Sequence, residues 1–228
     1  MREIVIDTET TGLDPLAGHR IVEIACVELA YHVPTGRVFH RYVDPERDMP
    51  EDALAVHGLT VEFLRRHSPF AAIADELVMF IGDARLVIHN AEFDLAFLNA
   101  EFARLGRGQI ASPFVDTLAV ARRRFPGAPA SLDALCRRFS IDLSGRDLHG
   151  AQIDCNLLAE VYIELLGGRQ PGLDFAAGAT ARILDHDVTA LPRLPPRPPR
   201  PHAPSLEELA AHKAMLATIN APLWLAAG

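Results

Sequence analysis

Cysteine, long apolar runs and basic residues are all scarce in this 228-residue sequence, and each shortage excludes a class of protein. The three cysteines are widely spaced, which argues against a disulfide framework or a zinc site and for reduced thiols in a cytosolic protein. No apolar run approaches the roughly 18 residues that a membrane span needs. The N-terminus lacks the basic and then apolar stretches of a signal peptide, so we expect a cytoplasmic protein with no membrane contact.

The shortage of basic residues limits how the chain can bind nucleic acid. It has 22 basic and 30 acidic residues, which give a net charge of −8. A protein this acidic binds nucleic acid poorly through a broad basic surface. The charge does not exclude a metal-dependent nuclease, because the acidic residues of such an enzyme hold cations that in turn hold the phosphate.

Hydrophobic residues make up 49% of the sequence, and their spacing predicts a mixed sheet with helices on both faces. Strands are expected from residue 4, at 21–29, 38–43, 86–89 and 114–115, with a turn at Thr35-Gly36. Helices are expected from residue 50, over 69–82, after Asn90 as a cap, over 117–125 with Asp116 as a cap, over 131–139 capped by Ser131, and over 151–166.

Composition divides the chain into three parts. Residues 1–168 form the predicted globular domain. Residues 169–204 read as a flexible linker, because seven prolines fall between Pro192 and Pro204 and favour extended chain. Residues 205–228 form a tail in which Ser205-Leu206-Glu207-Glu208 has the form of a capping box and predicts a helix from residue 206.

Two carboxylates end the first predicted strand. Asp7 and Glu9 lie two residues apart, so both point to the same face of the sheet. Their repulsion is relieved by a divalent cation, and hard oxygen ligands favour Mg²⁺ or Mn²⁺. A solvated strand end is the more common explanation of an isolated Asp-x-Glu pair.

Three further residues also have ordinary explanations when taken singly. Asp94 stands in the first turn of a predicted helix, where a carboxylate is favoured by the helix dipole. His149 by itself reads as a surface histidine, and Asp154 as a solvated acid. Only their occurrence together with Asp7 and Glu9, in this order, indicates a functional site.

In chain order these residues form the runs DTETTGLDP, HNAEFD and HGAQID, with VHGLT at 56–60. The pattern resembles the DEDDh 3′–5′ exonucleases, and among them the group that proofreads for bacterial replicative DNA polymerase. The resemblance covers roughly residues 2–166. The sister group with a tyrosine in the third motif fits less well, because Tyr162 follows Asp154 whereas His149 precedes it.

The resemblance implies an RNase H-like α/β fold with a mixed five-stranded sheet. It also implies two divalent ions held by Asp7, Glu9, Asp94 and Asp154, with Asp7 shared between them. His149 would be the general base that takes a proton from the attacking water, a task for which histidine is the most common residue.

The resemblance further suggests which residues grip the terminal nucleotides. Thr10 is expected to hydrogen-bond a sugar or phosphate, and Leu13 to wedge against the terminal base. The remaining positions of this predicted binding surface are Thr8, Thr11, Gly12, His57 and Phe93. We expect His57 and His89 to support the site without holding metal, and Asp116 to act as a helix cap.

The sequence therefore predicts a metal-dependent 3′–5′ deoxyribonuclease that removes mispaired 3′ termini. A stand-alone nuclease that trims RNA or short oligonucleotides is one alternative, although it has no evident use for the spacer and tail. A catalytically silent structural subunit is another, although the complete set of four carboxylates and a histidine argues against it.

Two segments after the domain predict partners. In the tail, Leu209, Leu216 and Ile219 fall near one helix face with Met215 beside them. By resemblance this tail binds the polymerase catalytic subunit; the alternative is that it folds back on the nuclease domain. In 170–175, Gln170, Leu173 and Phe175 resemble the short peptides that bind the sliding clamp, although an ordinary linker that packs on its own domain would look the same.

Overall fold

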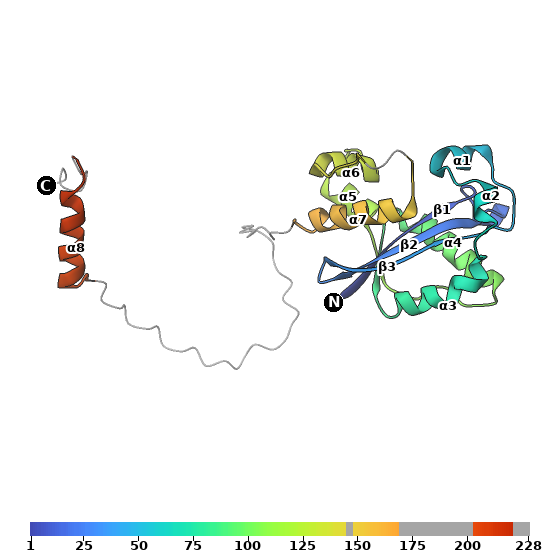
Figure 1. Ribbon diagram of the computed structural model, residues 1–228, viewed down its shortest axis with the longest axis horizontal. Coiled ribbons are helices and arrows are strands. Elements are labelled where there is room, and N and C mark those ends of the chain that lie inside the picture. The colour runs from blue at the N-terminus through green and yellow to red at the C-terminus, as the bar shows by residue number, and fades with distance from the viewer. Residues whose placement is uncertain (145–147, 169–202, 221–228) are drawn as a thin grey trace. The chain divides into compact units, whose positions relative to one another are not determined.

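The computed structural model describes residues 1–144, 148–168 and 203–220. The chain divides into two units, Met1–Phe175 and Ala176–Gly228, which are considered separately. The strands are β1 (Arg2–Thr10), β2 (Ile21–Ala30), β3 (Val33–Tyr42), β4 (Arg85–Ile88) and β5 (Phe114–Asp116). The helices of the first unit are α1 (Glu51–His57), α2 (Val61–Leu64), α3 (Phe70–Ile81), α4 (Ala91–Arg104), α5 (Thr117–Arg124), α6 (Leu132–Phe139) and α7 (Ala151–Leu165), with a short 3₁₀ helix at Pro15–Ala17 (Figure 1).

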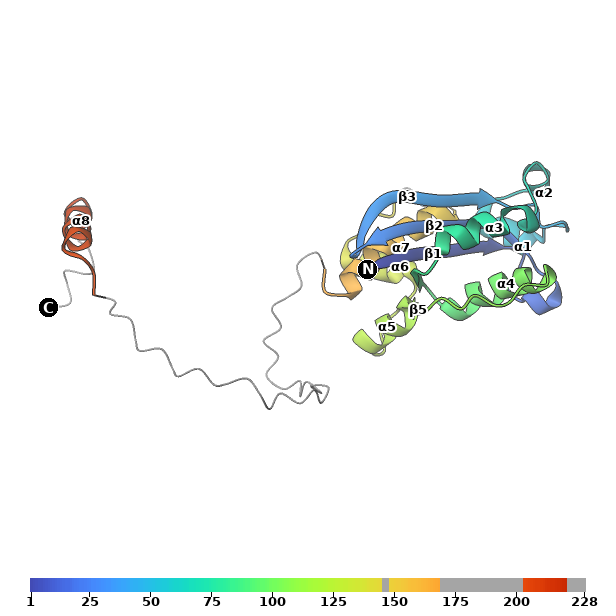
Figure 2. The same ribbon diagram turned by 90° about the horizontal axis from the view of Figure 1, so that it is seen from below.

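One mixed sheet organises the first unit. Its strand order is β3-β2-β1-β4-β5. The first three strands in the chain pair antiparallel, and β4 and β5 are added parallel to β1 (Figure 1 and Figure 2). The five-stranded mixed sheet predicted from the sequence is therefore confirmed.

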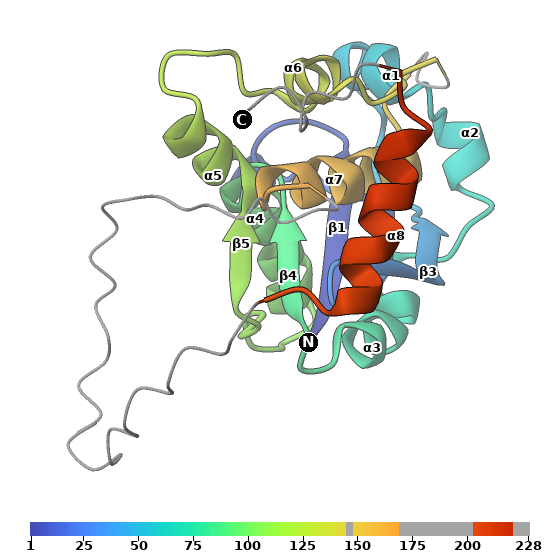
Figure 3. The same ribbon diagram turned by 90° about the vertical axis from the view of Figure 1, so that its left-hand side faces the viewer.

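The central strand β1 contributes to a hydrophobic core on each face of the sheet. Ile4 and Ile6 pack with residues of α3 and α4, whereas Val5 packs with residues of α5, α6 and α7. Figure 3 shows α7 and α4 on opposite sides of the strands. Because side chains alternate along a strand, Asp7 and Glu9 continue the α7 face and Thr8 continues the α4 face.

The hairpin between β2 and β3 turns at a different place from the one predicted. The turn is Tyr31-His32, where φ is +52° and +65°, and β3 begins at Val33. Thr35 and Gly36 lie inside β3, where the pairing shifts register between Val27 and Leu29 and Gly36 has φ of +84°. Gly36 therefore lies in a β-bulge within the strand. The two-residue turn is made by a tyrosine and a histidine, which are not typical of hairpin turns.

The predicted helix caps are confirmed except for one. Asp116 Oδ1 accepts from the Leu118 N–H at 2.9 Å, and Ser131 Oγ accepts from the Ala134 N–H at 3.3 Å. Asn90 stands at the N-cap position of α4, but its side chain makes no capping bond and its φ is +65°. Its N–H instead donates to Asp116 Oδ1 at 3.1 Å, so Asn90 joins the ends of β4 and β5.

The second unit contains the predicted tail helix, α8 (Leu206–Ala217). Both bonds of the capping box between Ser205 and Glu208 are present, as the sequence predicted. Gln170, Leu173 and Phe175 lie outside the described residues. In the described part of the chain, no helix is both long and apolar enough to cross a membrane.

Candidate active site

One cavity of about 780 Å³ lies where the carboxyl ends of β1 and β4 meet the N-termini of α4 and α7. All five residues predicted as metal ligands or general base line it: Asp7, Glu9, Asp94, His149 and Asp154. They come from three segments that are far apart in the sequence. The fold therefore brings together the residues that the sequence singled out.

Asp94 lies in the first turn of α4 and lines this cavity. Its side chain is almost fully buried, at 3% exposed, and its Oδ1 accepts a 2.8 Å hydrogen bond from Thr8 Oγ1. Burial raises the pKa of Asp94 to about 7, although the bond from Thr8 opposes the shift. Thr8 thus acts from the α4 face of β1, while Asp7 and Glu9 face the other way.

Asp7 is the electrostatic centre of the group. Its pKa is raised well above the ordinary value, first because the carboxylate is desolvated and then because Asp94, Glu9 and Asp154 repel its charge. Four neighbouring carboxylates repel one another when all are ionised. Bound divalent cations would offset that repulsion, and such cations prefer oxygen ligands. The donor set therefore fits hard divalent metal ions.

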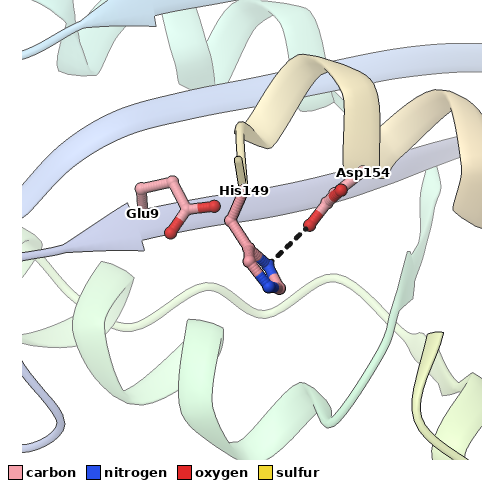
Figure 4. A group of neighbouring side chains, drawn as sticks. All are labelled: Glu9, His149 and Asp154. Carbon is pink, nitrogen blue, oxygen red and sulfur yellow. Dashed lines mark ion pairs between the residues drawn. The ribbon is translucent and has the colours of Figure 1, made fainter. Parts of the chain in front are cut away.

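His149 and Asp154 flank the start of α7. Asp154 is 4% exposed, whereas the side chain of His149 is about half exposed at 51%. His149 Nδ1 lies 3.3 Å from Asp154 Oδ2. Figure 4 shows the imidazole directed toward Asp154, with Glu9 on the neighbouring strand. One ligand atom from each of these three residues lies within 4.8 Å of the others, so this corner of the cavity could hold an ion.

The loop after β1 uses its hydroxyl groups to hold its own shape. Thr10 Oγ1 donates to the Gly12 carbonyl at 2.6 Å, and Thr11 Oγ1 accepts from the Arg20 N–H at 3.0 Å. A Cβ at Gly12 would lie 2.3 Å from His19 Cε1, so a larger residue there would require the His19 ring to move. Contact of these residues with a nucleotide stays a prediction.

The same loop forms one wall of an adjoining cavity of about 600 Å³. Leu13 is 85% exposed at its rim, and Phe93 of α4 lines both cavities. His57 lies in the wall, where its Nδ1 accepts from the Leu59 N–H at 3.0 Å and burial lowers its pKa. His89, whose Nδ1 lies 2.9 Å from Thr117 Oγ1, has its pKa lowered by burial too. Both are therefore neutral at physiological pH, in keeping with supporting roles.

Arg122 is a residue of the cavity that sequence reasoning missed. It lies on α5 and is the only arginine or lysine among the described residues that line the cavity. Its neighbours Arg123 and Arg124 extend the same basic run but do not line it. The run itself was visible in the sequence, but which of its members faces the acidic residues depends on the packing of α5.

Comparison with known proteins places this fold in a family of nucleases. The Exonuclease family matches residues 4–162. Exonuclease X in complex with 5′ overhanging duplex DNA is 26% identical with a TM-score of 0.57, over 72% of this chain and 90% of that one. The nuclease domain of 3′hExo, a DEDDh family member bound to rAMP, shares the fold at 19% identity and a TM-score of 0.64, over 72% and 91%. The fold and site thus define a metal-dependent 3′–5′ exonuclease.

Relatives with higher identity narrow this class. The DNA polymerase III subunit epsilon of Rickettsia felis is 56% identical over 174 residues, which are 75% of this chain and 76% of that protein. The same subunit of Escherichia coli is 42% identical over 228 aligned residues, 96% of this chain and 93% of that one. The chain belongs to the family of DNA polymerase III epsilon subunits.

Proposed function

We propose that this chain removes mispaired nucleotides from the 3′ end of DNA, as the proofreading subunit of a replicative polymerase in the cytoplasm. The observation that carries the proposal is the convergence of Asp7, Glu9, Asp94 and Asp154 on one cavity beside His149. Membership of the epsilon family supports DNA as the substrate.

The four carboxylates would hold two divalent ions, Mg²⁺ or Mn²⁺. When bound, such ions neutralise charge on the scissile phosphate and stabilise the leaving 3′ oxygen. The charges of the other three carboxylates all raise the pKa of Asp7, so Asp7 is central to the group and would help to hold both ions. Thr8 holds Asp94 in place by its hydrogen bond.

His149 would act as the general base. The approach of Nδ1 to Asp154 Oδ2 favours the tautomer with the ring proton on Nδ1. Nε2 is then the nitrogen that accepts a proton from the attacking water. Exposure of the ring at the cavity rim gives it access to that water.

The terminal nucleotide would lie between the loop after β1 and α4. Leu13 is exposed at the rim and would pack against the terminal base, and Phe93 lines the same cavity. Arg122 would meet a phosphate of the same strand, because it is a cation in a cavity that must admit a polyanion.

Arg122→Ala should raise KM for a single-stranded 3′ end and leave kcat nearly unchanged, because one phosphate contact is lost without altering the carboxylates. The salt dependence of log(kcat/KM) should flatten by about 0.7, the value for one contact to single-stranded nucleic acid. Arg123→Ala, on the same helix but outside the cavity, is the matched control. Equal effects of the two changes would show that only the general charge of α5 matters.

The function as a whole is tested by incubating the full chain with 3′-mismatched DNA and with matched RNA, each with and without Mg²⁺. We expect Mg²⁺-dependent removal of the mismatched deoxynucleotide and slower cutting of RNA. Preference for RNA would favour a stand-alone trimming enzyme, and no cutting of either substrate would favour a structural subunit.

We further propose that residues 205–228 bind the polymerase catalytic subunit. The similarity to the E. coli subunit spans 96% of this chain and so extends beyond the nuclease domain. Of the tail residues predicted to form an apolar face, Leu209, Met215 and Ile219 are exposed, at 43%, 50% and 42%, whereas Leu216 is buried at 6%. The exposed residues, together with Leu206 at 88%, offer apolar surface to a partner. Residues 169–204 would be the tether, and 170–175 would bind the sliding clamp through Gln170, Leu173 and Phe175.

Two changes should separate these interactions. Truncation after Arg200 should abolish co-purification with the polymerase and keep activity on free oligonucleotides. Alanine at Gln170, Leu173 and Phe175 should preserve polymerase binding and weaken assembly with the clamp. Polymerase binding that survives the truncation, or clamp assembly that is unchanged by the alanines, would overturn the corresponding assignment.

A further inference from the structure

Helix α7 begins without a cap of its own. Gly150 occupies the N-cap position and makes no side-chain capping bond. The next N–H, that of the fully buried Ala151, donates instead to Glu23 Oε2 of β2 at 3.2 Å. An unpaired N–H buried at this point would be costly, so a residue 128 positions earlier in the chain completes the helix.

Glu23 is itself almost fully buried, at 3% exposed. It stands directly opposite Glu9 in the pairing of β1 with β2 and therefore lies on the same face of the sheet. Its second oxygen, Oε1, lies 2.7 Å from His40 Nε2 on β3. A carboxylate buried beside Asp7 and Glu9 adds repulsion to the site, so its presence calls for a reason beyond stability.

The bond to Ala151 fixes the backbone next to His149. On one side, the His149 N–H donates to the Val56 carbonyl of α1 at 3.2 Å. On the other side, two residues later, Ala151 is held by Glu23. The same first turn of α7 carries Asp154. The backbone around His149 is thus held between α1 and β2.

We propose that Glu23 is a positioning residue for His149: by accepting the Ala151 N–H, it sets the start of α7 so that the imidazole faces the cavity. The inference rests on the proposed role of His149 as general base. What Glu23 supplies is an acceptor oxygen at the correct reach, and its negative charge is not required. His40 holds that carboxylate in place from the neighbouring strand.

Three substitutions separate reach from charge. Glu23→Ala removes the acceptor, and Glu23→Asp keeps the charge but is one methylene too short. Both should lower kcat by about 10- to 100-fold with little change in KM, since small displacements of a catalytic group have effects of this size. Glu23→Gln keeps an acceptor oxygen at full length and should retain nearly all of kcat. If Glu23→Ala fails to fold, the comparison of Glu23→Asp with Glu23→Gln still tests whether the reach of the acceptor oxygen or its charge sets kcat.

Glu28 provides the matched control. It lies on the same strand, is 5% exposed and is also bound by several partners, including Arg2 at 2.6 Å. It is distant in register from Glu9, opposite Ile4. Glu28→Ala should lower the melting temperature at least as much as Glu23→Ala and leave kcat unchanged. A fall in kcat for Glu28→Ala would show that general loss of stability explains the effect at Glu23.

A double-mutant cycle tests whether Glu23 acts through His149. In a His149→Ala background, Glu23→Ala should have no further effect on kcat. Mn²⁺ affinity, measured by calorimetry, should be the same in wild type and in Glu23→Gln. An undiminished effect in the His149→Ala background, or loss of Mn²⁺ binding in Glu23→Gln, would overturn the proposal. If His149→Ala alone retained full activity, the proposed function of His149 would fail separately.

Discussion

Asp7→Asn is expected to abolish phosphodiester cleavage and, at the same time, to stabilise the metal-free protein. Activity is lost because Asp7 is the carboxylate that interacts with Asp94, Glu9 and Asp154 together. Stability is gained because the desolvated charge and its repulsions disappear. For a chain of this size the melting temperature rises by about 2–4 °C for each kcal/mol of repulsion removed.

The pH dependence of this gain follows from the raised pKa values. The folded protein holds protons on Asp7 and Asp94 more tightly than the unfolded chain, where an aspartate has its ordinary pKa of 3.8. The metal-free protein therefore loses stability as pH rises from near 4 to about 7, the pKa of Asp94. Melting curves in a chelator should show Asp7→Asn gaining most above neutral pH, and added Mg²⁺ should help wild type more than the variant.

Exposed Glu160 of α7 supplies the control for that experiment. Glu160→Gln removes one negative charge from the same fold without touching the cavity, so it should leave both activity and the pH profile of melting unchanged. If Asp7→Asn lowered the melting temperature in the chelator, the carboxylate would be stabilising and the assignment of the cluster to cations would be wrong.

His149→Ala should lower kcat by about 10²- to 10⁴-fold, the usual contribution of a general base, while the affinity for Mn²⁺ stays close to that of wild type. The two measurements together distinguish a base from a ligand. This matters because an atom of His149 lies within 4.8 Å of atoms of Glu9 and Asp154. Loss of Mn²⁺ affinity would make His149 a ligand, and unchanged turnover at neutral pH would leave it no catalytic role.

The parts of this molecule that the sequence predicts are those encoded locally. The β-branched run Ile4-Val5-Ile6 predicts the central strand, and the alternation of side chains along a strand places Asp7 and Glu9 on one face. Asp116 and Ser131 were identified as caps because a cap and its helix are neighbours in the chain.

The parts that escaped prediction depend on residues far apart in sequence. Glu23 caps a helix that begins 128 residues later, and Arg122 reaches the cavity only because α5 packs beside it. The turn at Tyr31-His32 was missed for a different reason. Its positive φ angles are imposed by the pairing of β2 with β3, while the glycine that suggested a turn was needed for a bulge.

The alternation of side chains along β1 also determines whether this segment tolerates substitutions, insertions or deletions. Thr8 serves the α4 side, and Asp7 and Glu9 serve the α7 side, so every residue position is tied to one face. Deleting or inserting a single residue between Ile4 and Ile6 would turn Asp7 and Glu9 toward the α4 face and Ile6 toward the α7 face, if Ile4 kept its place. A substitution removes one contact, whereas a change of length relocates all of them. Functional variants of this segment should therefore differ in residue type but keep its length.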